Sequence, residues 1–275
     1  PREYGYDKYG AFNCAGEQMP VHDDVNHTIS LITEAIKKQK PFFINLWMHE
    51  PHTPFHVLPK YRWWFQDLEN ETDNIYAATL AHADDRIGCL LDFLDQNDLT
   101  KKTLVIFSSD NGPARAASPA ELKLSYDTAT GAGFGIGASK GVTGGRKGYK
   151  AALFEGGVCV PFIARWPGKI PAGVVDNQTL LSAVDLVPTL CELAGATMPA
   201  GYTPDGVSQV DALSGNAIPT REKPLFWKAT SPWPAPKNRP FHWGSYAVVD
   251  DRWKLIGNED LSYVELYAIT EDQLE

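Results

Sequence analysis

The segment Ser108-Ser109-Asp110-Asn111-Gly112-Pro113 places two hard oxygen donors, Asp110 and Asn111, directly after a run of apolar residues. Ligand sites of open α/β sheets lie just beyond the carboxyl ends of strands. Carboxylate and amide oxygens are the ligands that Ca²⁺ and Mg²⁺ prefer, but Ca²⁺ takes about 6–8 of them. The two side chains therefore indicate part of a metal site, with further ligands elsewhere. Asn-Gly and Gly-Pro are also common turn dipeptides, so a plain turn is the alternative.

Histidines and prolines alternate in the segment His49-Glu50-Pro51-His52-Thr53-Pro54, which follows another apolar run. The prolines restrict the backbone, so the imidazole of His52 can be held in one position. A histidine held in this way can donate a proton to a leaving group or bind an anion. The His-x-x-His spacing also raises zinc, but no cysteine or third histidine pattern completes the ligand set. A loop histidine without a role is the alternative.

Cations gather on a glycine-rich segment, Gly145-Arg146-Lys147-Gly148-Tyr149-Lys150, which precedes Glu155-Gly156-Gly157. Glycines permit close approach of the backbone and lysines attract anions, so the segment is suited to sulfate or phosphate. No GxxxxGK[ST] sequence occurs, which excludes a Walker loop. Solvated lysines on a surface loop are the alternative.

The elements that must position these residues alternate between helix and strand. Apolar residues recur at steps of 3 and 4 in residues 23–38 and 74–96, which predicts two amphipathic helices. Three continuous apolar runs predict strands buried on both faces, at residues 42–47, 103–108 and 158–166. Residues 186–194 predict a further helix with Asp185 as its N-cap and Gly195 as its stop. This alternation predicts an α/β fold with a large, mainly parallel sheet flanked by helices.

The remaining residues predict two connecting segments and a small C-terminal subdomain. Residues 112–148 are rich in glycine without periodicity, and residues 196–222 have the composition of a linker. Four short strands follow, at residues 225–227, 245–249, 252–256 and 264–269. Asp250-Asp251 predicts a hairpin turn between the middle pair. We therefore predict an α/β domain over residues 1–222 and a small antiparallel subdomain over residues 223–275.

Composition excludes several classes of protein. The 275 residues carry 25 basic and 34 acidic side chains and a net charge of −9. This balance excludes nucleic acid and membrane surfaces as expected partners, because both require a basic face. The apolar runs are too short to cross a membrane, and the polar start predicts no signal peptide within this segment. The four cysteines form no CxxC pair, which argues against a zinc knuckle or a redox motif.

Together, in this order, the motifs resemble those of the sulfatases, a family of the alkaline-phosphatase-like superfamily. The resemblance begins at Lys40-Pro41-Phe42-Phe43 and includes the segments of His52, Asp110 and Lys150. It continues through three further motifs: Val160-Pro161-Phe162-Ile163-Ala164-Arg165-Trp166-Pro167-Gly168, Trp253-Lys254-Leu255 and Glu265-Leu266-Tyr267. The spacing of so many motifs argues against coincidence.

The resemblance implies a sulfuric ester hydrolase that uses a formylglycine and one divalent cation, usually Ca²⁺. Asp110 and Asn111 match the second pair of metal ligands. His52 matches the histidine that contacts the sulfate ester and helps to protonate the leaving oxygen, and Lys150 matches the lysine that bridges the sulfate and the nucleophile. Two residues match substrate-binding positions of some members: Lys147 and His242.

Three parts of the family pattern are absent from the sequence, and one of them is the middle loop that carries a further lysine and histidine. The formylglycine is made from the cysteine of a Cys-x-Pro/Ala-Ser-Arg motif, and none of Cys14, Cys89, Cys159 and Cys191 lies in one. The Asp-Asp pair of metal ligands is also absent, because the pairs at 23–24 and 84–85 lie on helical patterns and the pair at 250–251 lies in the predicted hairpin turn. The resemblance therefore predicts a C-terminal segment of a sulfatase, whose partner is the N-terminal half of the catalytic domain.

The resemblance implies a sulfated small molecule or glycan as the substrate, with a polysaccharide or glycosaminoglycan sulfate preferred. It also implies a periplasmic, secreted or lysosomal location. Two other functions stay open: a non-catalytic remnant or binding module, and a related phosphodiesterase or phosphonate hydrolase. Lys150 ahead of Glu155-Gly156-Gly157 favours a sulfatase over the latter. A Cys-x-Pro/Ala-Ser-Arg motif upstream in the gene would favour the enzyme over the remnant.

Overall fold

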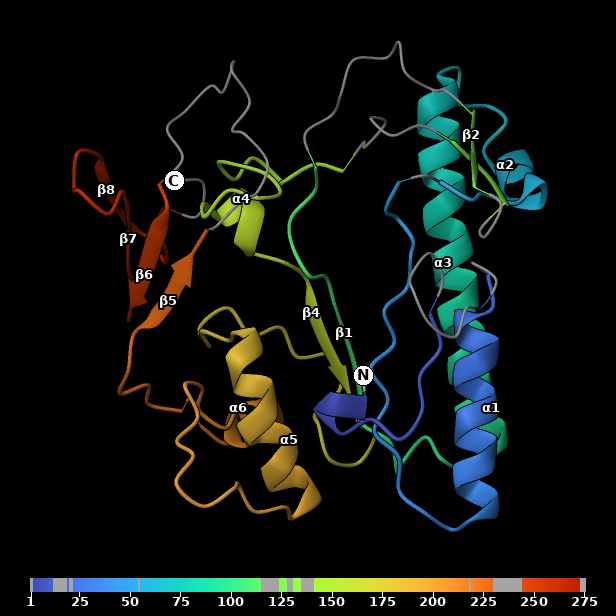
Figure 1. Cartoon of the computed structure of the whole chain (residues 1–275), viewed down its shortest axis with the longest axis horizontal. Helices are drawn as coiled ribbons and strands as arrows, with labels where there is room; N and C mark the ends of the chain where they lie inside the picture. The colour runs from blue at the N-terminus through green and yellow to red at the C-terminus, as the bar shows by residue number, and fades with distance from the viewer. Residues whose placement is uncertain are drawn as a thin grey trace. The chain divides into compact units, whose positions relative to one another are not determined.

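A computed structural model describes residues 2–11, 19, 22–53, 55–114, 124–127, 131–134, 141–217, 219–229 and 244–272. These residues form two compact units (Figure 1). The first unit contains the described residues up to Thr100 and the antiparallel hairpin of β2 (Leu124–Asp127) and β3 (Gly131–Phe134). The second unit contains Lys101–Ala114 and the described residues from Val142 onward.

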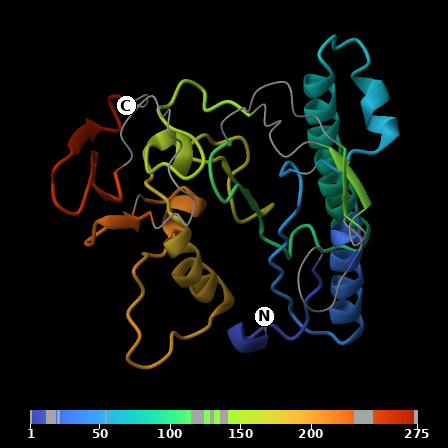
Figure 2. The same ribbon diagram turned by 45° about the horizontal axis from the view of Figure 1, so that its top comes forward.

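Two amphipathic helices dominate the first unit, and both confirm the sequence prediction. Helices α1 (Asp24–Lys37) and α3 (Glu71–Gln96) lie side by side, as the two views in Figures 1 and 2 show. Helix α3 begins earlier than predicted, because the side chain of Asn70 accepts hydrogen bonds from the backbone N–H groups of residues 72 and 73. A short helix that the sequence analysis did not predict, α2 (Pro59–Trp64), packs on α3, and a 3-10 turn, η1 (Arg2–Tyr4), lies near the N-terminus.

The predicted strand at residues 42–47 is wrong. This segment belongs to no helix or sheet among the described residues. Its residues alternate between half-buried and exposed, and Phe43 and Trp47 are 62% and 82% exposed. An apolar run alone does not make a strand, because a strand also needs a neighbour that completes its backbone hydrogen bonds. The described residues supply none for this segment.

In the second unit, β1 (Val105–Ser108) pairs with β4 (Phe162–Arg165). The two strands are antiparallel, with Val105 opposite Arg165 and Ser108 opposite Phe162. The sequence pattern predicted a mainly parallel sheet, which requires a long crossover, usually a helix, between neighbouring strands. The described chain between β1 and β4 contains only the β2–β3 hairpin and the short helix α4 (Glu155–Val158), so an antiparallel pair forms instead.

The small antiparallel sheet near the C-terminus confirms the prediction. Its four strands follow one another as a meander: β5 (Leu225–Lys228), β6 (Tyr246–Asp250), β7 (Trp253–Gly257) and β8 (Val264–Ala268). Asp250 pairs with Trp253, and Asp251 turns the chain with a positive φ of 52°. One face of the sheet buries Ala247 and Ile256 against Phe154, which is fully buried just before α4. All four strands lie within residues 223–275, and the domain boundary at residue 222 stays a prediction.

Residues 196–222 are more ordered than the predicted linker. Helix α5 (Leu186–Ala194) is confirmed, with Asp185 at its N-cap and Gly195 left-handed at its C-cap, and a further helix, α6 (Val210–Ser214), packs against it. The fully buried carboxylate of Asp185, at the end of the 3-10 turn η3 (Ala183–Asp185), accepts from the backbone N–H groups of residues 182 and 207, at 2.8 and 2.9 Å. It also forms an ion pair of 2.6 Å with Arg221. One buried charge thus orders the segment.

No helix among the described residues is both long enough and apolar enough to cross a membrane.

The Asp185→Asn substitution tests this interpretation of residues 196–222. It leaves the guanidinium of Arg221, which is 11% exposed, without its ion-pair partner. We expect the free energy of unfolding to fall by about 3–5 kcal/mol, as for other buried pairs that lose one partner. The matched control Asp176→Asn, in an exposed turn, should change it by less than about 0.5 kcal/mol. Equal urea unfolding midpoints for the two variants would contradict the assignment.

Candidate functional site

The loop after β1 presents Asp110 and Asn111 in a turn that its own side chains stabilise. Oγ of Ser109 donates to the carbonyl oxygen of Asn111 at 2.9 Å, and Nδ2 of Asn111 donates to that of Gly112, also at 2.9 Å. Oγ of Ser108 donates to the carbonyl oxygen of Pro161 beside β4 at 2.9 Å. The amide group of Asn111 thus uses its nitrogen within the turn, and its oxygen is the atom suited to a cation.

A junction of backbone hydrogen bonds connects this loop to the glycine-rich segment of the two lysines. The N–H of Gly112 donates to the carbonyl oxygen of Gly157 at 2.8 Å, and the N–H of Lys150 donates to that of Pro113 at 2.8 Å. Within the second segment, the N–H of Gly156 donates to the carbonyl oxygen of Lys147 at 2.7 Å. The structure therefore brings the segment of Asp110 and Asn111 together with that of Lys147 and Lys150.

Glycine is required at this junction because the two backbones approach too closely for a side chain. A Cβ atom at position 112 would lie 1.9 Å from the carbonyl oxygen of Gly156. A Cβ atom at position 156 would lie 2.5 Å from the carbonyl oxygens of Lys147 and Gly148. Both separations are far below van der Waals contact. Gly112 and Gly156 thus have a structural role in joining the two loops.

The two lysines differ in their surroundings. Nζ of Lys147 lies 2.6 Å from a carboxylate oxygen of Glu265 and 2.6 Å from the hydroxyl of Tyr267, both on β8, and 4.2 Å from the centre of the Phe154 ring. Burial raises the pKa of Glu265, but Lys147 and Tyr267 more than offset this, so the pKa lies below its usual value. Lys150 is half-buried directly beside the junction. The charge of Lys147 is therefore balanced within the chain.

Sequence analysis missed an ion pair that connects the sheet to the glycine-rich segment. Nζ of Lys254 on β7 lies 2.6 Å from a carboxylate oxygen of Glu155 at the start of α4, and Lys254 is completely buried. Both residues belong to motifs that carry the family resemblance, but 99 residues separate them in the sequence. Only their placement in the fold shows that the two motifs form one contact.

His52 belongs to the first unit and lies in an exposed turn, in which its N–H donates to the carbonyl oxygen of His49 at 2.8 Å. Its Nδ1 lies 2.6 Å from the carbonyl oxygen of Thr53. Because a carbonyl oxygen can only accept, Nδ1 carries a proton and Nε2 is the atom for exchange with a substrate. His242, which the resemblance predicts to bind substrate together with Lys147, lies outside the described residues.

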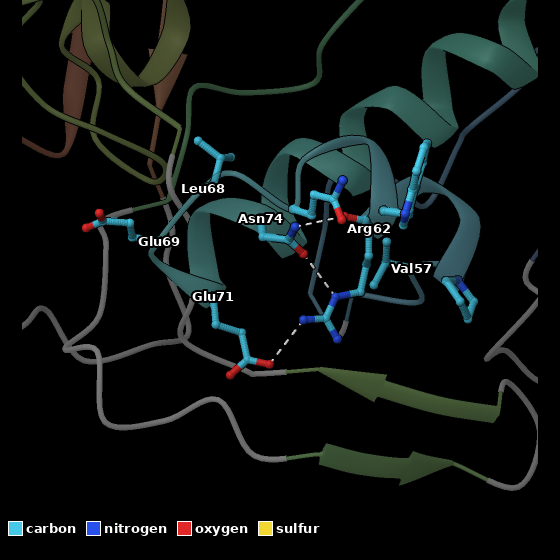
Figure 3. Close-up of a pocket in the computed structure, with 9 residues that line it drawn as sticks. Val57, Arg62, Leu68, Glu69, Glu71 and Asn74 are labelled. Carbon is cyan, nitrogen blue, oxygen red and sulfur yellow. Dashed lines mark hydrogen bonds and ion pairs between the residues drawn. The ribbon is translucent and has the colours of Figure 1, made fainter.

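A shallow pocket between α2 and α3 in the first unit contains none of the predicted site residues (Figure 3). The guanidinium of Arg62 lies in it, 3.1 Å from a carboxylate oxygen of Glu71 and 3.0 Å from the amide oxygen of Asn74. Nδ2 of Asn74 donates to the carbonyl oxygens of residues 62 and 65, so these polar groups hold α2 against α3. The polar groups that line the pocket therefore have a structural role, because they connect the two helices.

Comparison with known proteins identifies the family. The sulfatase family model matches residues 2–196, and a model described as N-sulphoglucosamine sulphohydrolase, C-terminal, matches residues 146–275. The chain belongs to the sulfatase family, as its motifs predicted. The N-acetylgalactosamine-6-sulfatase of Canis lupus familiaris is 30% identical over 81% of this chain and 37% of its own length. An uncharacterized sulfatase of Escherichia coli, YdeN, is 27% identical over 90% of this chain and 43% of its own length.

Solved structures support the same fold. The crystal structure of Ps i-CgsB superposes with a TM-score of 0.70 at 24% identity, over 95% of this chain and 51% of that one. The chain therefore has the alkaline-phosphatase-like α/β fold of the sulfatases, with the small antiparallel sheet near its C-terminus. It spans less than half the length of the curated relatives that it matches.

The Gly112→Ala substitution tests the junction. The added methyl group overlaps the carbonyl oxygen of Gly156, so we expect the free energy of unfolding to fall by about 1–3 kcal/mol or more. Gly88→Ala is the matched control, because no atom lies within 4 Å of its Cβ position in α3. It should instead stabilise the chain by about 0.5–1 kcal/mol. Chemical denaturation measures both, and the same sign for both variants would contradict the close approach.

Proposed function

We propose that the chain is the C-terminal part of a sulfuric ester hydrolase that acts on a sulfated carbohydrate. The backbone junction is the observation that carries the proposal. It holds the loop of Asp110 and Asn111 against the segment of Lys147 and Lys150, which supports a common site for the oxygen donors that bind a cation and the lysine that binds an anion. A sulfate ester requires both, because negative charge on its oxygens must be offset as the ester bond breaks.

In the proposed reaction, the ammonium group of Lys150 binds the sulfate and offsets its charge. His52 is the general acid: its ring, protonated at both nitrogens, gives the proton on Nε2 to the leaving oxygen of the sugar and keeps the proton on Nδ1. The bond between Nδ1 and the carbonyl oxygen of Thr53 supports this role, because it orients the ring and fixes which nitrogen faces the substrate. Lys147 contributes farther out, since Glu265 and Tyr267 already hold its ammonium group.

Asp110 and Asn111 fit part of a Ca²⁺ site. They offer a carboxylate and an amide oxygen on adjacent residues, and the hydrogen bond from Nδ2 to Gly112 orients the amide. When bound, Ca²⁺ supplies positive charge at the sulfate. In this proposal, the remaining ligands come from the N-terminal half of the catalytic domain, outside these 275 residues.

The same part of the protein supplies the nucleophile in this proposal. The sequence contains no Cys-x-Pro/Ala-Ser-Arg motif, and the chain covers 37% and 43% of the two relatives described above. We propose that the formylglycine cysteine lies upstream in the parent gene. By analogy with the family, we further propose a periplasmic, secreted or lysosomal location.

The names of related proteins support a carbohydrate as the substrate. The model that matches residues 146–275 is named for an N-sulphoglucosamine sulphohydrolase, and the canine relative is an N-acetylgalactosamine-6-sulfatase. The similar protein Ps i-CgsB has also been crystallised with k-i-k-neocarrahexaose. We propose a sulfate ester of a polysaccharide or glycosaminoglycan.

A non-catalytic binding module is the second candidate. It is favoured by the missing cysteine motif and by the ion pair that occupies Lys147. Such a protein would retain the lysine segment and bind sulfated glycans without hydrolysing them.

Substitution of the two lysines in the full-length enzyme separates their roles. Lys150→Ala should lower kcat by about 10²–10³-fold, the range for loss of one preorganised charge-stabilising group. Lys147→Ala should lower kcat less and reduce thermal stability more, because Glu265 loses its ion-pair partner. Steady-state kinetics and melting curves measure the two effects. Equal losses of kcat would show that the two positions have been assigned to the wrong roles.

Activity measurements on two forms of the protein test the proposal itself. The 275-residue chain should not hydrolyse a chromogenic aryl sulfate. Co-expression with the N-terminal half of its own gene and a formylglycine-generating enzyme should produce activity, which His52→Ala should abolish. Turnover by the 275-residue chain alone would disprove the proposal that these residues form only part of the active site. No turnover by the assembled protein, with formylglycine verified by mass spectrometry, would favour the binding module.

A further inference from the structure

Five of the seven histidines in the sequence form a continuous chain of ring contacts within the first unit. In order of contact they are His52, His49, His56, His22 and His82, with ring centroids 4.7–6.5 Å apart. Neighbouring imidazoles repel one another when both are protonated. A neutral imidazole is the form that binds metal ions.

The inner end of this chain surrounds a carboxylate. Nδ1 of His22 lies 3.6 Å from Oε1 of Glu50, and Nδ1 of His82 lies 3.5 Å from the same oxygen. One ligand atom from each residue lies within 4.8 Å of the others. Both separations exceed those of ordinary hydrogen bonds, which are about 2.7–3.2 Å. They are close to the edge of a zinc tetrahedron, about 3.3–3.5 Å for Zn–N bonds of about 2.0–2.1 Å.

Two of the three side chains, those of His22 and His82, lack a partner that buried polar groups usually have. The side chains of His82 and Glu50 are 3% and 4% exposed, and that of His22 is 29% exposed. Nδ1 of His22 and Nδ1 of His82 are buried without a hydrogen-bond partner. Buried polar atoms in native proteins are almost always paired, so two orphaned nitrogens directed at one carboxylate require an explanation.

The protonation states suit a cation. Burial lowers the pKa of His82, which keeps the ring neutral near pH 7. Burial raises the pKa of Glu50, but its interactions with His22, with its own backbone and with His82 more than offset this, so its pKa lies below the usual value and the carboxylate is ionised. Asp24, which is 5% exposed, lies near enough to interact electrostatically with Glu50 and His22.

The three residues come from separate parts of the first unit. His22 precedes α1, Glu50 lies in the turn of His52, and His82 lies on α3. The ring of Tyr61 on α2 stacks on His82 with centroids 4.8 Å apart, which orients the imidazole. A metal ion at this position would therefore connect both long helices to the turn that carries His52.

We propose that His22, Glu50 and His82 form a binding site for one Zn²⁺ ion, with water as the fourth ligand, that stabilises the turn of His52. The two imidazoles and one carboxylate are ligands that Zn²⁺ accepts in tetrahedral sites, whereas Ca²⁺ requires an all-oxygen set. This site is separate from the Ca²⁺ site proposed at Asp110 and Asn111 and uses none of its residues.

Calorimetric titration of the metal-stripped chain with Zn²⁺ at pH 7 tests the proposal. We expect one ion per chain, no competition from Ca²⁺, and a visible absorption of the Co²⁺ form that is typical of tetrahedral coordination. His22→Ala and Glu50→Gln should each weaken Zn²⁺ binding by about 100-fold or more, because even loss of an outer-shell partner costs about 10–100-fold. The matched control His27→Gln removes a histidine of α1 outside the cluster and should leave the affinity unchanged.

Two results would overturn the proposal: no Zn²⁺ binding by the unsubstituted chain, or binding that neither His22→Ala nor Glu50→Gln weakens. Circular dichroism of each metal-free variant separates loss of the ligand from loss of the fold. His22 is partly exposed and Glu50→Gln keeps the shape of the side chain, so we expect both variants to fold. Zn²⁺ should also raise the melting temperature of the unsubstituted chain and not that of Glu50→Gln.

Discussion

Close contact between two backbones is the constraint on which the second unit depends. The N–H of Gly112 donates to Gly157, and the N–H of Lys150 donates to Pro113, at distances that leave no room for a side chain at position 112 or 156. These bonds are short-range and directional, so they fix the loop after β1 relative to the lysine segment more narrowly than apolar packing alone. The proposed metal ligands and the proposed sulfate-binding lysine acquire a common position from this contact.

Buried ion pairs extend the order of the second unit beyond the junction. Glu155 follows the segment of Lys147 and Lys150 and forms an ion pair with the fully buried Lys254 on β7. This ion pair connects the four-stranded sheet to that segment. The ion pair of Asp185 and Arg221 likewise connects the start of α5 to the segment that follows α6. Charges in such places are stable only when each has a partner, because a lone buried charge costs several kcal/mol. These ion pairs therefore favour the observed contacts over any packing that would leave one of the buried charges without its partner.

Polar groups organise the first unit by a different route. The chain of histidine rings runs from the exposed His52 to the buried His82, and Glu50 is the acidic group at its inner end. Tyr61 stacks on His82, and Asn74 and Arg62 hold α2 against α3. The residue proposed as the general acid is thus the outermost member of a network whose inner members contact both long helices, and a cation bound there would stiffen the network.

The sequence by itself determined the features that depend on local pattern. The period of apolar residues predicted α1, α3 and α5, and the Asp250-Asp251 turn and short alternating runs predicted the C-terminal meander. The family followed from motifs whose order is readable along the chain. The prediction of a strand at residues 42–47 was wrong, and the antiparallel pairing of β1 with β4 was not predicted. A strand forms only beside a neighbouring strand, and the residues of one segment do not show which other segment will pair with it.

Only the tertiary structure decided which side chains meet. Lys147 reaches Glu265 across 118 residues and Lys254 reaches Glu155 across 99, separations at which sequence spacing carries no information about contact. Sequence analysis considered zinc at His49 and His52 and found too few ligands, whereas folding brings Glu50 to His22 and His82, which lie on separate elements. Residue types indicated the chemistry, and the contacts between distant segments decided where that chemistry is assembled, because long-range packing and burial set the geometry and charge of each group.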